Sequence, residues 1–172
     1  AADLPPGKLS LRSIGLNNNG NTLKAMADGD FQVFAGLERL ESISTNKLTI
    51  TPAAFEVFAT CPALEEIQMQ YNSLGDALWP YLAGVKKLRK MVQGFDGLPV
   101  QGIGISNLSR TTMEELVLGS TSIVDEALKE IGKFTALKTL ILETTKISDA
   151  GVPALAGLNK LERLNVRGTN VT

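Results

Sequence analysis

The hydrophobic residues in the second half of the chain follow a pattern that repeats every 24 residues. The segment LKTLILETTKISDAGVPALAGLNK, which begins at Leu137, starts again at Leu161 as LERLNVRGTNVT. In both copies the apolar residues follow the order L-x-x-L-x-L/V, and Thr145 aligns with Thr169. A fixed period of this length indicates an architecture in which similar structural units stack along one axis.

The same template, carried backward, divides the chain into about seven units of the leucine-rich-repeat type. Their first residues are Leu11, Leu40, Leu64, Leu88, Met113, Leu137 and Leu161. Residues 1–10 form a cap or linker in this division, and the last unit is truncated. A second apolar position supports the register at Phe31, Phe55, Trp79, Ile103, Leu128 and Val152. We therefore predict one repeat domain over residues 1–172.

Each unit combines a strand pattern with a helix pattern. The L-x-x-L-x-L half alternates between inward and outward positions, whereas Val152, Leu155 and Leu158 have helical spacing. Thr51 before Pro52, and Ser148 with Asp149, are typical helix start signals. Stacked units bury a continuous core, so we expect an α/β rod with a parallel sheet on its concave face and helices on its convex face.

Polar residues recur in the same register. Position 2 of the units reads Arg12, Glu41, Glu65, Arg89, Glu114, Lys138 and Glu162. In a parallel stack these residues lie about 4.8 Å apart, so opposite charges become lateral neighbours. Position 9 reads Leu48, Asn72, Asp96, Thr121, Thr145 and Thr169. We interpret its small polar side chains as partners for backbone groups at the turn after each strand.

The last units resemble a known class of repeat. They carry T-x-I-S-D-A-G at residues 145–151 and G-T-N-V-T at residues 168–172. These motifs resemble bacterial leucine-rich repeats with the consensus L-x-x-L-x-L-x-x-T-x-I/V-S/T-D-A-G-L/V, which are similar to the ribonuclease-inhibitor and cysteine-containing classes. The match is strong over residues 113–172 and looser over 40–87. The resemblance implies a right-handed α/β solenoid and a protein-binding role, with no catalytic residues.

Composition excludes several kinds of chemistry. The chain has 172 residues, a net charge of −1, no histidine and one cysteine, Cys61. Without histidine, the commonest general base and the ordinary zinc ligand sets are missing, so we predict no enzymatic activity, metal or cofactor. Cys61 fits a buried core position. The balanced charge predicts no nucleic-acid partner, and no apolar run approaches the roughly 20 residues that span a bilayer.

Two units depart from the template. The first has extra residues around Asn17-Asn18-Asn19-Gly20-Asn21, which fit either a surface insertion or a ligand-contacting loop. In the fourth, Gln93 takes an inward strand position. Its other interruptions are Gly94, Gly97, Pro99, Gly102 and Gly104. We expect a 3₁₀ turn or an extended segment there instead of a regular helix, with a local change in the curvature of the rod.

The concave face supplies the candidate binding site. Position 5 of the units places Val92, Val117 and Ile141 as an outward apolar row on adjacent strands. Residues beside this row complete the candidate site: Gln68, Gln70, Tyr71 and Phe95. An exposed apolar row with aromatic neighbours is typical of a docking surface. An alternative is that β-branched residues are there because they suit strands.

Two functions follow from these patterns. The first is a non-enzymatic module that binds a protein or peptide through its concave face. The second is a structural or assembly role, in which the open C-terminal edge pairs with another copy or belongs to a longer rod. The chain begins Ala1-Ala2-Asp3 without methionine, which fits either signal removal or an arbitrary boundary. We lean toward a secreted, periplasmic or cell-surface protein.

Overall fold

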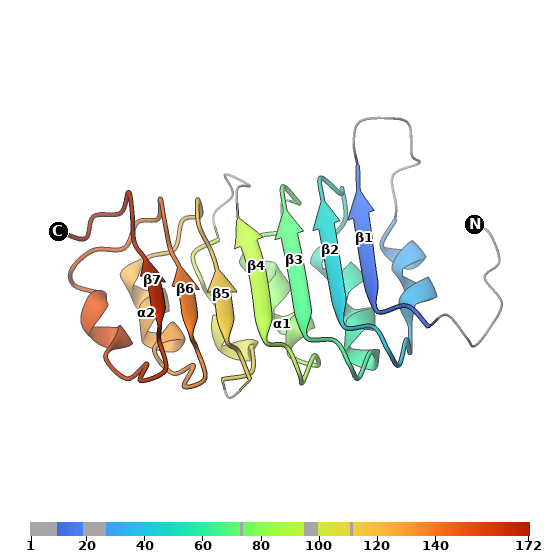
Figure 1. Ribbon diagram of the computed structural model, residues 1–172. Helices are drawn as coiled ribbons and strands as arrows, with labels where there is room; N and C mark the ends of the chain where they lie inside the picture. Colours follow the sequence, from blue (N-terminus) through green and yellow to red (C-terminus); the bar gives the residue numbers. More distant parts are fainter. Residues whose placement is uncertain (1–9, 19–26, 73, 95–99, 111) are drawn as a thin grey trace.

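The computed structural model describes residues 10–18, 27–72, 74–94, 100–110 and 112–172. Seven parallel strands form one sheet in the order in which they occur along the chain (Figure 1). The strands are β1 Ser13–Asn17, β2 Ser42–Asn46, β3 Glu66–Gln70, β4 Lys90–Gly94, β5 Glu115–Val117, β6 Thr139–Ile141 and β7 Arg163–Asn165. The predicted leucine-rich-repeat solenoid, with about seven repeats of mostly 24 residues, is confirmed.

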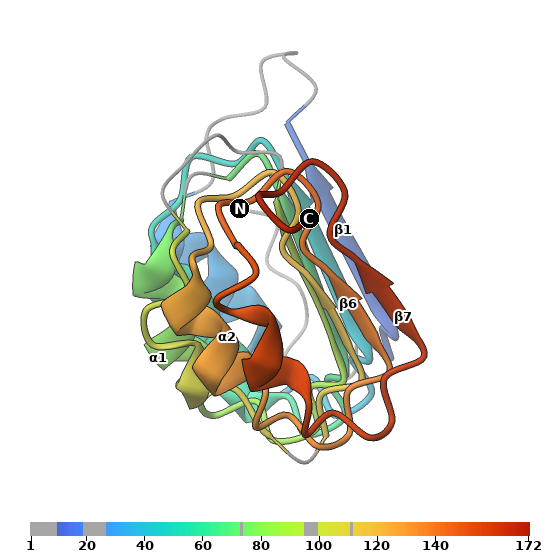
Figure 2. The same cartoon turned by 90° about the vertical axis from the view of Figure 1, so that its left-hand side faces the viewer.

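Helical segments cover the face of the sheet opposite to the concave face (Figure 2). They are η1 Asp28–Phe34, η2 Pro52–Thr60, η3 Asp76–Leu78, α1 Trp79–Leu82, η4 Ile105–Asn107, α2 Asp125–Ile131 and η5 Val152–Leu155. Five of the seven are 3₁₀ helices. The segments are short, from three to nine residues, and the longest of them, η2, is a 3₁₀ helix.

The core lies between the sheet and the helical layer, and its composition changes along the rod. In the first two units Phe31, Phe34, Phe55 and Phe58 pack together, with ring centroids 5.7–6.2 Å apart. Further along, the inward positions are mostly leucine, isoleucine and methionine. The inward residue at position 4 of each unit is buried from Ile14 to Leu140, whereas its counterpart Leu164 in β7 is 43% exposed.

The helix starts differ from the prediction. Thr51 does precede η2, but its hydroxyl makes no capping bond and donates instead to Asp28 of the preceding unit. Ser148 likewise donates its hydroxyl to Asp125, at 2.6 Å, and the residue that precedes η5 is Gly151. The side chains predicted to cap their own helices therefore join neighbouring units.

Aspartates at one position of the unit make these inter-unit bonds. Asp28, Asp76 and Asp125 each begin a helical segment, and each accepts backbone N–H groups from the following unit at 2.8–3.0 Å. Asp149 accepts the N–H and the hydroxyl of Thr172 in the same way. These contacts satisfy backbone donors at the turn that leads into each helical segment.

The fourth unit contradicts one predicted core position. Ile103 is 69% exposed, whereas Val100 and Ile105 are buried. Gly102 and Gly104 have φ values of 86° and 88°, in the left-handed region that favours glycine. These reversals turn Ile103 outward and let its neighbours fill the core. The expected 3₁₀ turn is present as η4, and Gln93 is buried as predicted.

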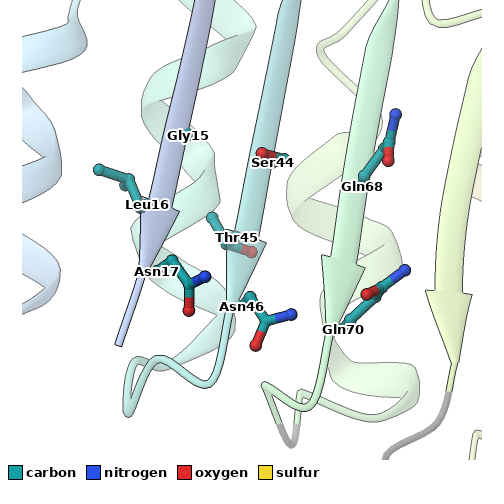
Figure 3. A pocket seen from close by; sticks show the side chains of 8 residues that line it. All are labelled: Gly15, Leu16, Asn17, Ser44, Thr45, Asn46, Gln68 and Gln70. Carbon is teal, nitrogen blue, oxygen red and sulfur yellow. The ribbon is translucent and has the colours of Figure 1, made fainter. Parts of the chain in front are cut away.

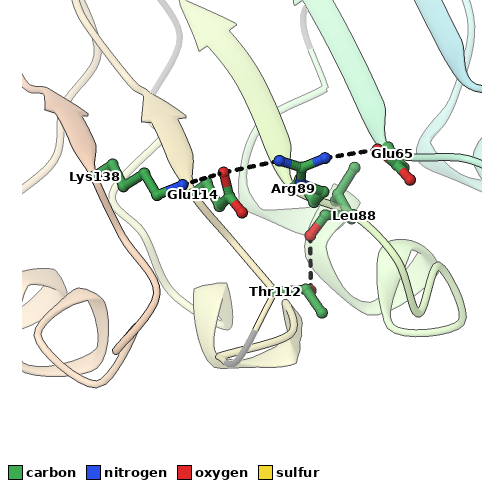
Figure 4. Close-up of polar contacts among 6 residues, drawn as sticks. All are labelled: Glu65, Leu88, Arg89, Thr112, Glu114 and Lys138. Carbon is green, nitrogen blue, oxygen red and sulfur yellow. Dashed lines mark hydrogen bonds and ion pairs between the residues drawn. The ribbon is translucent and has the colours of Figure 1, made fainter. Parts of the chain in front are cut away.

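The predicted polar rows are present in the structure. Arg89 contacts Glu65 and Glu114, and Lys138 contacts Glu114, with N–O distances of 3.0–3.1 Å (Figure 4). At position 9, the Thr121, Thr145 and Thr169 hydroxyls donate to backbone carbonyls three residues earlier. Asn72 accepts the N–H of Leu48 and donates to Thr45. These side chains connect backbone segments, as predicted.

Three predicted features lie wholly or partly in segments that the structure does not describe, and one concerns Cys61. The predicted insertion beyond Asn18, Asp96 and the cap over residues 1–9 lie outside the part of the chain that the structure describes. Cys61 is 3% exposed, and burial raises the pKa of its thiol. Its predicted core position is confirmed.

Candidate functional site

The concave face of the sheet divides into two chemically different halves. Its outward residues are positions 3, 5 and 7 of each unit. On β1 to β3 these are hydroxyl or carboxamide residues, glycine and one glutamate: Ser13, Gly15, Asn17, Ser42, Ser44, Asn46, Glu66, Gln68 and Gln70. On β4 to β6 the middle position is occupied by Val92, Val117 and Ile141. We call these three residues the apolar row.

A hollow of about 390 Å³ lies over β1 to β3 (Figure 3). Its lining residues are Gly15, Leu16, Asn17, Ser44, Thr45, Asn46, Gln68 and Gln70, and none is charged. We call this feature the polar hollow. Strand register places Asn17, Asn46 and Gln70 side by side, and Gly15 beside Ser44 and Gln68. Gly15 and Ser44 have small side chains, which leave the hollow open at its centre.

The polar hollow ends at β4 for a steric reason. Gly94 follows Gln70 in the register. A β-carbon added to Gly94 would lie 2.4 Å from the carbonyl oxygen of Gly119. This close approach excludes a side chain, so the row of carboxamides cannot continue onto β4 in the same arrangement.

The apolar row is less exposed than the sequence predicted. Val92 is 8% exposed and Ile141 is 9% exposed, while Val117 is half-buried. Val92 and Ile141 nevertheless lie outside the core cluster, because outward strand positions face away from the helices. Neighbouring side chains on the concave face therefore cover most of their surface. The row is outward-facing as predicted, but the prediction that it is widely exposed was wrong.

Tyr71 lies directly after β3 and has an exposed aromatic side chain. It directly follows Gln70 and is 47% exposed. The Lys47 ammonium nitrogen lies 5.7 Å from the centre of its ring, within cation–π range. Its φ of 58° is shared by Lys47, Ser120 and Thr144 at the same position of their units. That backbone conformation therefore belongs to the turn after each strand. Phe95 lies outside the described residues.

Several charged side chains of adjacent units form lateral ion pairs. Hydrogen bonds from Arg89 and then Lys138 lower the pKa of the Glu114 carboxyl. Arg89 and Lys90, from the basic cluster of the fourth unit, both contact glutamates. In the ranges that the structure covers, no group of three acidic or cysteine side chains could hold a metal ion. No described helix has the length and apolar character to cross a membrane.

The sequence prediction included Gln68 and Gln70 but missed the rest of the polar hollow. Gly15, Asn17, Ser44 and Asn46 recur at positions 5 and 7 of the first two units, and this recurrence was the available signal. The prediction searched for apolar and aromatic side chains. Asn17 and Asn46, which the parallel register aligns with Gln70, were therefore not predicted.

Comparisons with known proteins place the fold. No protein-family model matches the chain, and no curated protein matches it. An internalin, inlF, from Listeria monocytogenes has a similar structure, with a TM-score of 0.62 and 19% identity. The similarity covers 82% of this chain and 45% of that one.

A second solved structure is similar over more of its own length. Internalin C2, inlC2, from Listeria monocytogenes matches with a TM-score of 0.60 and 17% identity, over 85% of this chain and 68% of that one. The present chain thus spans less than half of the first neighbour and about two thirds of the second. These likenesses establish that the chain has the leucine-rich-repeat fold of the internalin structures.

Proposed function

We propose that the chain is a non-enzymatic module that binds a protein or peptide through its concave face. The observation that carries this proposal is the apolar row. Three β-branched side chains lie in register on β4 to β6 and face away from the core. A solenoid of this kind presents an extended concave surface, which is the surface that such proteins use for binding.

Side chains next to the row suit a docking surface. Tyr71 supplies an exposed aromatic group, and Gln68, the register neighbour of Val92, supplies a hydrogen-bonding group at the border with the polar hollow. Protein interfaces combine aromatic anchors near the centre with a polar rim. We therefore propose that the partner contacts Tyr71 and Val117, while Val92 and Ile141 support the surface beneath it. Phe95 remains part of this proposal from its sequence position alone.

A binding role agrees better with the side-chain chemistry than an enzymatic role. Glu65 and Glu114 form a lateral row with Arg89, and the aspartates of the helix starts accept backbone N–H groups of the following unit. General acid–base catalysis instead needs groups that converge on a substrate. The absence of histidine from the sequence removes the commonest such group.

The proposal can be tested by selecting binding peptides from a random display library. Val117→Lys should weaken binding of the selected peptides at least tenfold, because it places a charge in the centre of the apolar row. Lysine can extend its ammonium group into water, so the fold should tolerate the change. Val33→Lys is the matched control, since Val33 is 45% exposed and lies in η1 on the helical side. Selected peptides that bind both variants equally would contradict the proposed surface.

The C-terminal edge favours a second candidate function, in assembly. Leu164 occupies the register position of the buried Leu116 and Leu140, yet it is 43% exposed. Contact along this edge with a second copy, or with further repeats of a longer rod, would cover it. Leu164→Lys should shift a self-associating protein to monomers in sedimentation experiments. A wild-type protein that is monomeric at all concentrations would exclude self-association through this edge.

The location of the protein remains a prediction. We propose that it is a secreted, periplasmic or cell-surface protein. Detection of the native protein in separated cell fractions would test it.

A further inference from the structure

The carboxamides of the polar hollow have hydrogen-bonding capacity that the protein itself does not use. Across the described ranges, the side chains of Asn17, Asn46, Gln68 and Gln70 make no hydrogen bond to another protein group. Each offers two N–H donors and one carbonyl acceptor. The hydroxyl of Ser44 likewise makes no hydrogen bond to a described protein group. Donors and acceptors are thus gathered on one surface with only water to satisfy them.

Several polar side chains elsewhere on the concave face are used internally. Asn165 on β7 donates to the Glu143 carboxylate at 2.9 Å and accepts the backbone N–H of Arg167 at 3.0 Å. Ser42 donates to Ser13 at 2.9 Å, just beyond the hollow. The polar hollow thus gathers neutral amide and hydroxyl groups that have no protein partner among the described residues, whereas Asn165, the outward amide of β7, is bonded within the protein.

The composition of the hollow selects the class of ligand. None of its lining residues is charged, so an ionic ligand would give up water without gaining an opposite charge. The hollow also lacks an exposed large apolar side chain, since Leu16 is half-buried and Thr45 is buried. Protein partners are normally anchored by apolar or aromatic groups in such sites. A neutral ligand with many hydroxyl groups matches the alternating donors and acceptors.

The volume of the polar hollow and the residues next to it also suit a neutral ligand with many hydroxyl groups. Small-molecule sites commonly measure about 300–1,000 Å³, and the hollow lies near the lower end of that range. Tyr71 follows Gln70 directly, and an aromatic ring combines an apolar face with a polar hydroxyl. We propose that the polar hollow binds an uncharged oligosaccharide, as a function separate from the protein contact assigned to the apolar row.

The test is a titration followed by nuclear magnetic resonance. The side-chain NH₂ signals of Asn17, Asn46, Gln68 and Gln70 report directly on the hollow. Maltohexaose, cellohexaose and the hexamer of N-acetylglucosamine serve as probes, because all three are uncharged and differ in linkage and substituents. At least one should shift these signals in a saturable manner. The double variant Asn46→Ala, Gln70→Ala should bind that sugar roughly tenfold or more weakly, because two hydrogen-bonding groups are lost.

A steric variant tests the hollow without removing any hydrogen-bonding group. A β-carbon added to Gly15 would meet only the Ser44 hydroxyl, at 3.5 Å, which is an ordinary contact. Gly15→Tyr should therefore fold, fill the hollow and abolish sugar binding. Gly29→Tyr is the matched control, because a β-carbon there has no atom within 4 Å and Gly29 lies in η1. Urea unfolding of both variants verifies that they are folded.

Three outcomes would overturn the proposal. The first is the absence of a saturable shift with all three sugars up to their solubility limits. The second is sugar binding that persists in Gly15→Tyr. The third is an uncharged Gly-Ser-Asn peptide that shifts the same signals more strongly than any sugar, which would assign the hollow to a peptide. Failure here is distinct from failure of the protein-binding proposal, because Val117→Lys leaves the polar hollow intact.

Discussion

The two halves of the concave face share one backbone and differ in chemistry. β1 to β3 carry glycine, serine and carboxamide side chains around a neutral hollow, whereas β4 to β6 carry the apolar row beside the ion pair of Lys90 and Glu115. The inward positions of both halves keep the same apolar pattern. The comparison shows that the repeat determines the core side of each strand and leaves the outward side free to vary.

The outward side chains of the two halves also differ in how closely they pack against one another. Val92 and Ile141 are covered by neighbours on the same face, so each contributes to the packing of the rod. The carboxamides of the polar hollow make no hydrogen bond to the protein groups that the structure describes. We therefore expect substitutions to alter stability in the C-terminal half and mainly ligand binding in the N-terminal half.

The largest expected difference comes from placing a carboxylate at the same strand position in each half. Ile141→Asp should lower the free energy of unfolding by about 3–5 kcal/mol, because the charge is buried without a partner. Ser44→Asp should change it by less than about 0.5 kcal/mol, since Ser44 is exposed. Urea unfolding measures both values. Equal losses would show that the two halves are packed alike.

Acid should weaken inter-unit bonds in the C-terminal half. The hydroxyl and then the backbone N–H of Ser148 lower the pKa of Asp125, and the N–H and hydroxyl of Thr172 lower the pKa of Asp149. A lowered pKa in the folded state means that the unfolded state takes up protons first as pH falls. The stabilisation is therefore complete at neutral pH and is lost below the ordinary aspartate pKa of about 3.9.

The variant Asp125→Asn isolates this contribution. It should reduce stability at pH 7 and also reduce the fall in the urea midpoint between pH 6 and pH 3, because its side chain does not titrate. Ser122→Ala is a control in the same turn that leaves the carboxylate unchanged. Identical pH profiles for wild type and Asp125→Asn would contradict a stabilising role for this carboxylate.

The smallest effects should come from the carboxamides themselves. Asn165→Ala should cost about 1 kcal/mol, because the side chain bonds to Glu143 and to the backbone of Arg167. Asn46→Ala should change stability by less than about 0.5 kcal/mol, since that amide has no protein partner in the described chain. Thermal unfolding of the two variants makes the comparison. A large loss for Asn46→Ala would indicate a structural role for the polar hollow.

The sequence predicted the fold well because the repeat constrains it at many positions at once. The leucine spacing gave the strands and their parallel register, and the alternating charges anticipated the contacts of Arg89 with Glu65 and Glu114. The threonines at position 9 were also interpreted correctly. Each of these features depends on residues that recur at a fixed interval, so errors at one unit are corrected by the others.

The features that the sequence did not predict depend on local backbone geometry or on lateral packing. Ile103 was misplaced because two left-handed glycines reverse the chain on either side of it, and a periodic template does not include such reversals. The exposure of Ile141 depends on the neighbouring side chains that lie over it. The hydroxyl of Thr51 was expected to accept a backbone N–H of its own helix, but it donates to the Asp28 carboxylate of the adjacent unit.

The most direct test of this account compares two variants against two ligands. Gly15→Tyr fills the polar hollow, and Val117→Lys places a charge in the apolar row. We predict that Gly15→Tyr loses the bound oligosaccharide and retains the selected peptide, while Val117→Lys retains the oligosaccharide and loses the peptide. Loss of both ligands in one folded variant, or of neither ligand in both variants, would contradict the division of the concave face into two binding surfaces.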